Sequence, residues 1–235
     1  MSHEEQLSLF GREPKAEPEV TAMQFETIPT DANVAIPSGT YSDIDALANH
    51  CHECQRCGLG ATRTHAVVGK GNPKAPIVLI GEGPGQNEDE QGLPFVGRSG
   101  ELLDKILASV NLTTEEDVYI CNVVKCRPPG NRNPNPDEIE ACKPYLLEQI
   151  RLVDPKMILL TGAVAVKALL NEKRGITKIR GQWFEWENRR CMPIFHPAYL
   201  LRNPSREKGK PKWLMWQDMQ AVKAKLDELR QAEES

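Results

Sequence analysis

The run Ile77-Val78-Leu79-Ile80, followed at once by Gly81-Glu82-Gly83-Pro84-Gly85, decides the fold class of this chain. Consecutive apolar residues before a glycine-rich turn are typical of a strand that is buried on both faces. Similar runs occur at residues 118–124, 157–161 and 191–195. Helix-like stretches lie between and after them, at about residues 100–110, 136–152, 163–170 and 213–229. This alternation predicts an α/β fold, a three-layer α/β/α sandwich with a central, mainly parallel four-stranded sheet.

The chain divides into a tail and one domain. Residues 1–40 contain four prolines, many acidic side chains and little apolar periodicity. They are expected to be a disordered tail before a folded domain at residues 41–235. No apolar run approaches the roughly 20 residues that span a bilayer, and the N-terminus has no secretion signal. We therefore expect a cytoplasmic protein, and we expect it to be a monomer.

One apolar island lies inside the tail, at Gln6-Leu7-Ser8-Leu9-Phe10. Apolar residues in a segment with nothing to pack against are either a chance occurrence or a short docking peptide. This pentapeptide resembles the peptide with which bacterial DNA-metabolism proteins dock on the sliding clamp. A bacterial sliding clamp is therefore an expected partner.

Four cysteines form two spaced pairs. The first pair has the spacing C-x2-C and the second has C-x15-C: Cys54, Cys57, Cys126 and Cys142. Disulfides are rare in a reducing cytosol, and four thiolates in two groups suit a zinc ion or an iron-sulfur cluster. The wide second spacing favours the cluster. Spacing alone leaves the ligand set open, because Cys51 extends the first group to C-x2-C-x2-C.

The charged residues are unevenly distributed along the chain. Residues 1–60 carry ten acidic and three basic side chains, whereas residues 171–212 carry eleven basic and four acidic ones. A basic excess of this size can neutralise the phosphates of a nucleic acid, although an ordinary solvated surface explains it equally well.

Polar or glycine-rich residues mark three of the predicted strands. The turn at residues 81–85 follows the first strand, Asn122 lies near the middle or end of the second, and residues 196–202 follow the fourth. Sheets of this kind bind ligands at the carboxyl ends of their strands. The sequence therefore predicts a binding site on this edge of the sheet.

Together these segments resemble the family 4 uracil-DNA glycosylases. The matching segments are GEGPG at residues 81–85, Pro94-Phe95-Val96-Gly97, the run Asn122 to Arg132 with Lys125-Cys126-Arg127-Pro128-Pro129-Gly130-Asn131, and HPAYLLR at residues 196–202. The resemblance reaches from about Cys54 to the last helix. It implies the uracil-DNA glycosylase fold and a monofunctional enzyme of base excision repair that hydrolyses the N-glycosidic bond of uracil in DNA. It also implies a 4Fe-4S cluster held by the four paired cysteines.

The resemblance gives roles to three side chains, and their chemistry agrees with those roles. A uracil in a duplex must be flipped into a pocket before its edges can be read. Phe95 would stack on the ring, and its place in a Pro-Phe-Val-Gly turn disfavours full burial in the core. Asn122 offers a donor and an acceptor that match O4 and N3–H of uracil. His196 would contact O2 and, as a neutral imidazole, stabilise the charge that collects on the leaving base.

The activation of water is assigned less directly. Family 1 glycosylases have an aspartate at the third position of the first motif, where this chain has Gly83. Glu82 is the expected general base, because it is the only carboxylate in the motif, and Asn131 is expected to position the water. Backbone groups of Glu82, Gly83 and Pro84 would line the pocket. Glu88 or a neighbour is expected near C5, the atom at which thymine differs from uracil.

Basic residues after His196 are expected to bind the phosphates beside the flipped nucleotide. They are Arg202, Arg206, Lys208, Lys210 and Lys212. Leu200 or Leu201 is expected either to wedge into the base stack or to pack in the core.

Three other functions stay open on the sequence. One is a cluster-bearing DNA-binding module without catalysis, and another is a zinc-dependent hydrolase that uses the four cysteines. The third is the covalent-trapping branch of the same superfamily, which carries an arginine-rich insert. Nothing like that insert lies between Asn122 and Pro136, so we expect no stable protein–DNA adduct.

Overall fold

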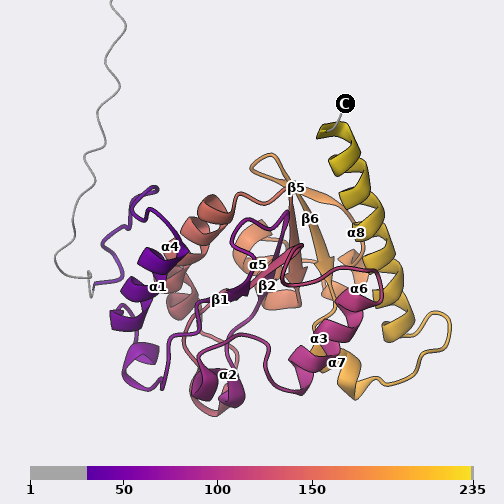
Figure 1. The fold of residues 1–235 in the computed structure, drawn as a ribbon. Coiled ribbons are helices and arrows are strands. Elements are labelled where there is room, and N and C mark those ends of the chain that lie inside the picture. Colours follow the sequence, from indigo (N-terminus) through magenta and orange to yellow (C-terminus); the bar gives the residue numbers. More distant parts are fainter. Residues whose placement is uncertain (1–30, 234–235) are drawn as a thin grey trace, which may run out of the picture.

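The structure is a computed structural model that describes residues 31–233, and these residues fold around one six-stranded sheet (Figure 1). The strands lie in the order β1-β3-β2-β4-β6-β5. The four inner strands are parallel to one another: β2 (Ile77–Gly81), β3 (Val118–Asn122), β4 (Met157–Thr161) and β6 (Arg189–Ile194). Their residues are almost all buried, as in a sheet that is covered on both faces.

The prediction of four strands was wrong by two, although the α/β class and the parallel inner sheet are confirmed. The described chain adds one antiparallel strand at each edge, β1 (Gly69–Gly71) beside β3 and β5 (Phe184–Trp186) beside β6. Each edge strand has only three residues, and none of them is buried. The sequence therefore shows no apolar run at either place.

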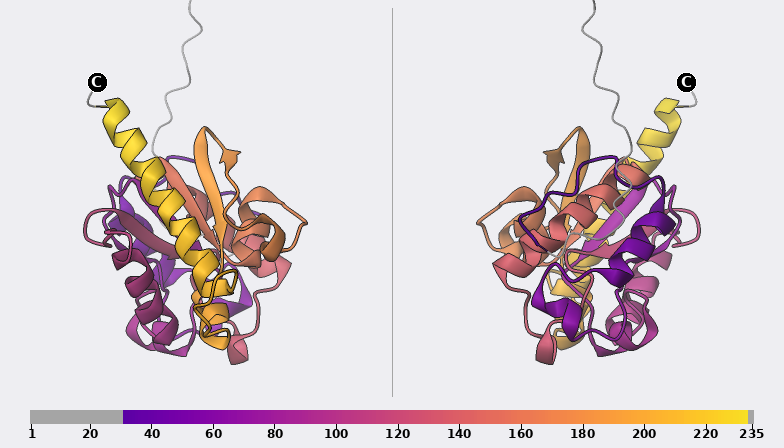
Figure 2. Two further views of the ribbon diagram at one scale, coloured as in Figure 1. Left: turned by 90° about the vertical axis from the view of Figure 1, so that its right-hand side faces the viewer. Right: turned by 90° about the vertical axis from the view of Figure 1, so that its left-hand side faces the viewer.

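Helices cover both faces of the sheet and make the three predicted layers (Figure 2). The helices over one face are α1 (Ile44–Glu53), α4 (Pro136–Val153) and α5 (Ala163–Leu170). Those over the other face are α3 (Arg98–Ala108), α7 (Pro197–Arg202) and α8 (Pro211–Glu233). Shorter elements connect them: α2 (Gln86–Gln91), α6 (Ile176–Ile179) and turns of 3-10 helix at Gly58–Ala61 and Pro129–Asn131. Because alternate strand residues point to opposite faces, Val78 and Ile80 join one core while Ile77 and Leu79 join the other.

The last helix, α8, is tied to the beginning of β3. Arg230 of α8 donates to Asp117, the residue before β3, over 2.7 Å. The other carboxylate oxygen of Asp117 accepts from the backbone N–H of Thr113 over 2.9 Å. The strand that starts at this ion pair ends at Asn122.

Residues 32–39 lie against the domain, although the sequence assigned them to the tail. Arg56 donates to the carbonyl of Ala32 over 2.9 Å, and the backbone N–H of Gly39 donates to Glu148 over 2.9 Å. Ile36 is 8% exposed and belongs to the core. Contacts with the domain therefore begin before residue 41. In the part of the chain that the structure describes, no helix is both long and apolar enough to cross a membrane.

Candidate active site

The carboxyl ends of the four inner strands meet at one edge of the sheet and surround a cleft of about 740 Å³. One lining residue comes from each strand end or from the loop that follows it: Glu82, Asn122, Gly162 and His196. Parallel topology produces this arrangement, because the chain leaves all four inner strands at the same edge of the sheet. The cleft lies where the sequence predicts a binding site.

Phe95, Asn122 and His196 converge in this cleft. The ring centroids of Phe95 and His196 are 5.8 Å apart. Gly81, at the end of β2, lies against the Phe95 ring and the Asn122 amide. A Cβ at Gly81 would be 2.8 Å from the Phe95 ring and closer still to Asn122 Oδ1. The absence of a side chain at residue 81 therefore allows the phenyl ring and the amide to come together.

Phe95 is more buried than its turn suggested. Its side chain is 6% exposed and packs in the core with Leu103, so the expectation of partial burial was wrong. The backbone of Phe95 has φ 53, the left-handed region that residues other than glycine seldom adopt. The ring belongs to the core and also lines the cleft.

Glu88 and Lys70 hold the loop in this conformation. One carboxylate oxygen of Glu88 accepts from the backbone N–H of Val96 and Gly97 over 3.1 and 3.0 Å, and the other accepts from Gly85 over 3.1 Å. Lys70 Nζ donates to the carbonyl of Phe95 over 3.0 Å. Glu88 lines the cleft, but both of its oxygens bind backbone groups and join the first motif to the Phe95 loop.

Asn122 and His196 present free polar groups to a ligand. Asn122 is 2% exposed, and its side-chain amide has no hydrogen bond to the described residues. His196 Nδ1 accepts from the backbone N–H of Ala198 over 3.1 Å, which leaves the proton of the neutral ring on Nε2. Burial, with the nearby charge of Arg202, lowers the pKa of His196 to about 4. The imidazole is therefore an uncharged donor at neutral pH.

Glu82 and Asn131 also line the cleft. The carboxyl group of Glu82 has no hydrogen-bond partner among the described residues, and burial raises its pKa. Asn131 is exposed, and its Oδ1 accepts from Arg127 Nε over 2.7 Å. The amide N–H groups of Asn131 and the second lone pair of its Oδ1 are left for a water or a ligand.

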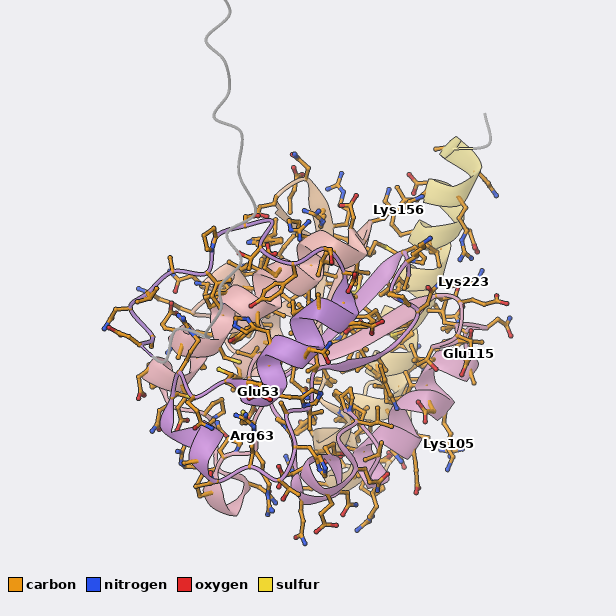
Figure 3. The ribbon with its side chains drawn as sticks, turned by 60° about the vertical axis from the view of Figure 1, so that its left-hand side comes forward. Glu53, Arg63, Lys105, Glu115, Lys156 and Lys223 are labelled. Atoms are coloured by element: carbon orange, nitrogen blue, oxygen red, sulfur yellow. The ribbon has the colours of Figure 1, made fainter. Side chains whose placement is uncertain are left out.

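The four paired cysteines gather around a second, smaller cavity, which we call the thiol cavity: Cys54, Cys57, Cys126, Cys142 and also Cys51. Three N–H groups point at its sulfur atoms. The backbone N–H of Arg56 donates to Cys54 over 3.5 Å, that of Lys125 to Cys142 over 3.3 Å, and Arg63 Nη1 to Cys126 over 3.5 Å. Arg63 also donates to the backbone carbonyls of His52 and Cys54, on either side of Glu53 at the end of α1 (Figure 3).

Tyr145 completes the thiol cavity. Its side chain is 1% exposed, and its hydroxyl lies beside Cys54 without a hydrogen bond of ordinary geometry. A buried hydroxyl of this kind is costly unless a ligand provides its partner. Within residues 31–233, no three His, Cys, Asp or Glu side chains are close enough to hold a single metal ion.

Comparison with known proteins shows the family. A family model described as the uracil DNA glycosylase superfamily matches residues 68–220. The chain is similar to the type-4 uracil-DNA glycosylase of Thermotoga maritima, with 46% identity over 70% of this chain and 86% of that protein. Its identity to the type-4 enzymes of Sulfurisphaera tokodaii and Saccharolobus solfataricus is 43% and 40%, over 70% and 78% of this chain and 79% and 87% of theirs. This chain belongs to the type-4 uracil-DNA glycosylases.

The family membership confirms the resemblance that the motifs carry. In this chain the predicted DNA-binding residues lie partly in the cleft and partly in the loop after α7. Arg202 lines the cleft, whereas Arg206, Lys208 and Lys210 are exposed in the loop after α7. None of these four residues forms an ion pair with the described part of the chain.

Ion pairs account for much of the other basic charge between residues 171 and 212. Four arginines of this segment are paired: Arg174 with Glu172, Arg180 with Asp218, Arg189 with Asp154 and Arg190 with Glu185. The basic residues of this segment that have no ion pair with the described residues are Lys173, Lys178, Arg202, Arg206, Lys208, Lys210 and Lys212. Leu200 is 1% exposed in the core, so it cannot act as the wedge, and Leu201 is partly exposed.

Sequence reasoning missed two arginines of the cleft. Arg98 begins α3 and is exposed, and Arg132 is oriented by Glu138 through contacts of 2.6 and 2.8 Å. Both lie in or next to motifs shared with the type-4 glycosylases. Their position beside residues with predicted roles is the signal that identifies them.

Proposed function

We infer that this protein removes uracil from DNA by hydrolysing its N-glycosidic bond, the first step of base excision repair. The inference is carried by one observation: Phe95, Asn122 and His196 share one cleft in a chain that belongs to the type-4 glycosylases. An aromatic ring, an amide and a neutral donor suit a pyrimidine that has been flipped out of the helix.

Recognition follows from the groups that the cleft leaves free. The Phe95 ring stacks on the base, an interaction worth about 1 to 3 kcal/mol. The amide of Asn122 donates to O4 and accepts from N3–H of uracil. Cytosine has an amino group at C4 and no proton on N3, so neither hydrogen bond could form with it.

Bond cleavage uses His196 and Glu82. The C1′–N1 bond breaks with its electron pair on uracil, and Nε2–H of His196 stabilises the charge that forms at O2. Glu82 accepts a proton from a water whose oxygen bonds to C1′. The departing anion is later protonated by solvent, so the products are free uracil and an abasic site, with no covalent adduct.

The assay uses a labelled oligonucleotide with one uracil, incubated with the full chain and then treated with alkali. Cleavage at the uracil position supports the proposal, and the same oligonucleotide with thymine serves as the control. An uncut strand would identify a binding module without catalysis and reject the enzyme. A protein–DNA adduct that survives denaturation would instead indicate the covalent-trapping branch.

We also propose that Cys54, Cys57, Cys126 and Cys142 hold a 4Fe-4S cluster. Convergence of the thiols on one cavity, N–H donors directed at three sulfur atoms and the unpartnered hydroxyl of Tyr145 all support it. Hydrogen bonds to sulfur are a feature of such sites. The cluster would tie the start of the domain to α4 and to the loop after β3.

Metal analysis of anaerobically purified protein tests this proposal. Iron and acid-labile sulfide in equal amounts, with a brown colour, are expected. Zinc in a colourless protein with full activity would reject the cluster. Cys51→Ser should keep the iron if the proposed ligand set is right, whereas Cys54→Ser should lose it.

The remaining proposals concern partners. Arg202, Arg206, Lys208 and Lys210 bind DNA phosphates, and the chain acts as a cytoplasmic monomer. The expected clamp-docking peptide, residues 6–10, lies outside the described residues. Deleting residues 1–10 should abolish retention on immobilised sliding clamp and leave uracil release unchanged. Retention of the shortened chain would reject clamp docking through this peptide.

A further inference from the structure

Lys125 is a buried cation that the proposed reaction does not use. Its side chain is 2% exposed, and no carboxylate of the described residues forms an ion pair with it. A buried ammonium group is costly unless its surroundings supply compensating charge and hydrogen bonds. The contacts of Lys125 therefore indicate what it stabilises.

Those contacts lead in two directions. Lys125 Nζ donates to the backbone carbonyl of Asn122 over 2.6 Å. The backbone N–H of Lys125 donates to Cys142 over 3.3 Å, and the residue lines the thiol cavity. One residue thus contacts both the strand end that reads the base and a proposed ligand of the cluster.

Asn122 needs support from its backbone. Its side-chain amide has no hydrogen bond to the described residues, so the orientation of the amide depends on the peptide groups around it. On one side, β3 pairs Asn122 with Gly81, and the backbone N–H of Val123 donates to Gly81 over 2.9 Å. On the other side, the carbonyl of Asn122 is held by Lys125. Displacement of a positioning group by about 1 Å can cost an enzyme on the order of 100-fold in rate.

We propose that Lys125 is a positioning residue for uracil recognition, which joins the thiol cavity to the carbonyl of Asn122 and so fixes the base-reading amide. The proposal rests on the proposed function, because it assumes that Asn122 reads uracil. A cluster bound by four thiolates carries net negative charge, which would offset the charge of the ammonium group. The side chain of Lys125 then provides a direct link from the thiol cavity to the position of Asn122 in the cleft.

Arg63 provides a matched control. It is a second cation of the thiol cavity, and it donates to Cys126 over 3.5 Å and to the carbonyl of Cys54 over 2.6 Å. Its guanidinium also donates to the carbonyl of His52, so its hydrogen bonds to the described residues all end away from Asn122. Arg63→Met therefore removes a cation from the cavity and leaves the bond between Lys125 and Asn122 in place.

The experiment compares the full-length wild type with Lys125→Met, Lys125→Gln and Arg63→Met. Iron content is measured first, and the dissociation constant of free uracil is then measured by calorimetry at matched iron content. Lys125→Met should bind uracil about tenfold more weakly than the wild type, a difference that calorimetry resolves easily. Lys125→Gln keeps a hydrogen-bond donor, so its dissociation constant should lie between those of the wild type and Lys125→Met. Arg63→Met should bind uracil as the wild type does.

The possible outcomes separate the two proposals. A wild type that neither binds nor releases uracil contradicts the proposed function itself. Wild-type affinity in Lys125→Met, or equal losses in Lys125→Met and Arg63→Met, overturns the positioning role while leaving the enzyme intact. If both Lys125 variants fail to fold or to retain iron while Arg63→Met does both, Lys125 serves the thiol cavity alone and the proposal is rejected.

Discussion

At the scale of single residues, His196 combines a fixed tautomer with a low pKa. Its Nδ1 is occupied by the N–H of Ala198, and burial lowers the pKa of the ring to about 4. A donor that is already oriented and uncharged needs no reorganisation when charge develops on the base. Electrostatic preorganisation of this kind acts on the transition state more than on the bound substrate.

His196→Ala should therefore lower kcat by about 100-fold or more, with a smaller effect on KM. Single-turnover release of uracil measures the chemical step directly. Unchanged iron content and an unchanged unfolding midpoint would show that the variant is intact. A rise in KM with normal kcat would mean that His196 only binds the base.

The pH dependence of the rate should follow Glu82. Burial raises the pKa of this carboxyl above its usual 4.5, and the pKa of His196 is about 4. As the pH falls, Glu82 is protonated first, so kcat/KM should decline while His196 is still neutral. Glu82→Gln should remove this acid limb and lower the rate by about 100-fold or more. If the limb persists in Glu82→Gln, another group is the base.

At the scale of elements, the inner sheet was predictable and the edges were not. Apolar runs such as Ile77 to Ile80 specify strands by themselves, and the rule for parallel sheets then brings Glu82, Asn122 and His196 to one edge. Strands β1 and β5 were missed because their residues are partly exposed and too few to show a pattern. The periodicity of apolar residues also gives no information on the direction in which a single side chain points. The burial of Phe95 and the bond from Lys125 to Asn122 therefore became visible only in three dimensions.

The end of β2 should not tolerate a side chain. In Gly81→Ala the new Cβ would be 2.8 Å from the Phe95 ring and closer to Asn122 Oδ1, so it would push the two groups apart. We expect kcat/KM to fall by about tenfold or more while the fold is retained. Gly175→Ala is the matched control, because a Cβ there meets nothing within 4 Å and its φ of -65 is ordinary. Equal activity in the two variants would contradict this account.

At the scale of the whole molecule, a basic side chain can bind a DNA phosphate most effectively where no carboxylate of the protein is paired with it. Replacing Arg206, Lys208 and Lys210 together by Gln should weaken binding to uracil-containing duplex. The slope of the logarithm of the binding constant against the logarithm of the salt concentration should also become shallower, by about 0.9 for each phosphate that the variant no longer neutralises. The rate of uracil release at saturating DNA concentration should hardly change. The same replacement at Arg174, Arg189 and Arg190, which are paired with carboxylates, is the control and should leave the slope nearly constant.

The ion pair between Arg230 and Asp117 joins the last helix to the strand that ends at Asn122. Because Arg230 follows Phe95, Asn122 and His196 in the sequence, it is synthesised after all three of them. A nascent chain therefore lacks both this anchor and the helix that covers one side of the sheet. The cleft should therefore reach its final geometry only after α8 has been synthesised and has packed on the sheet.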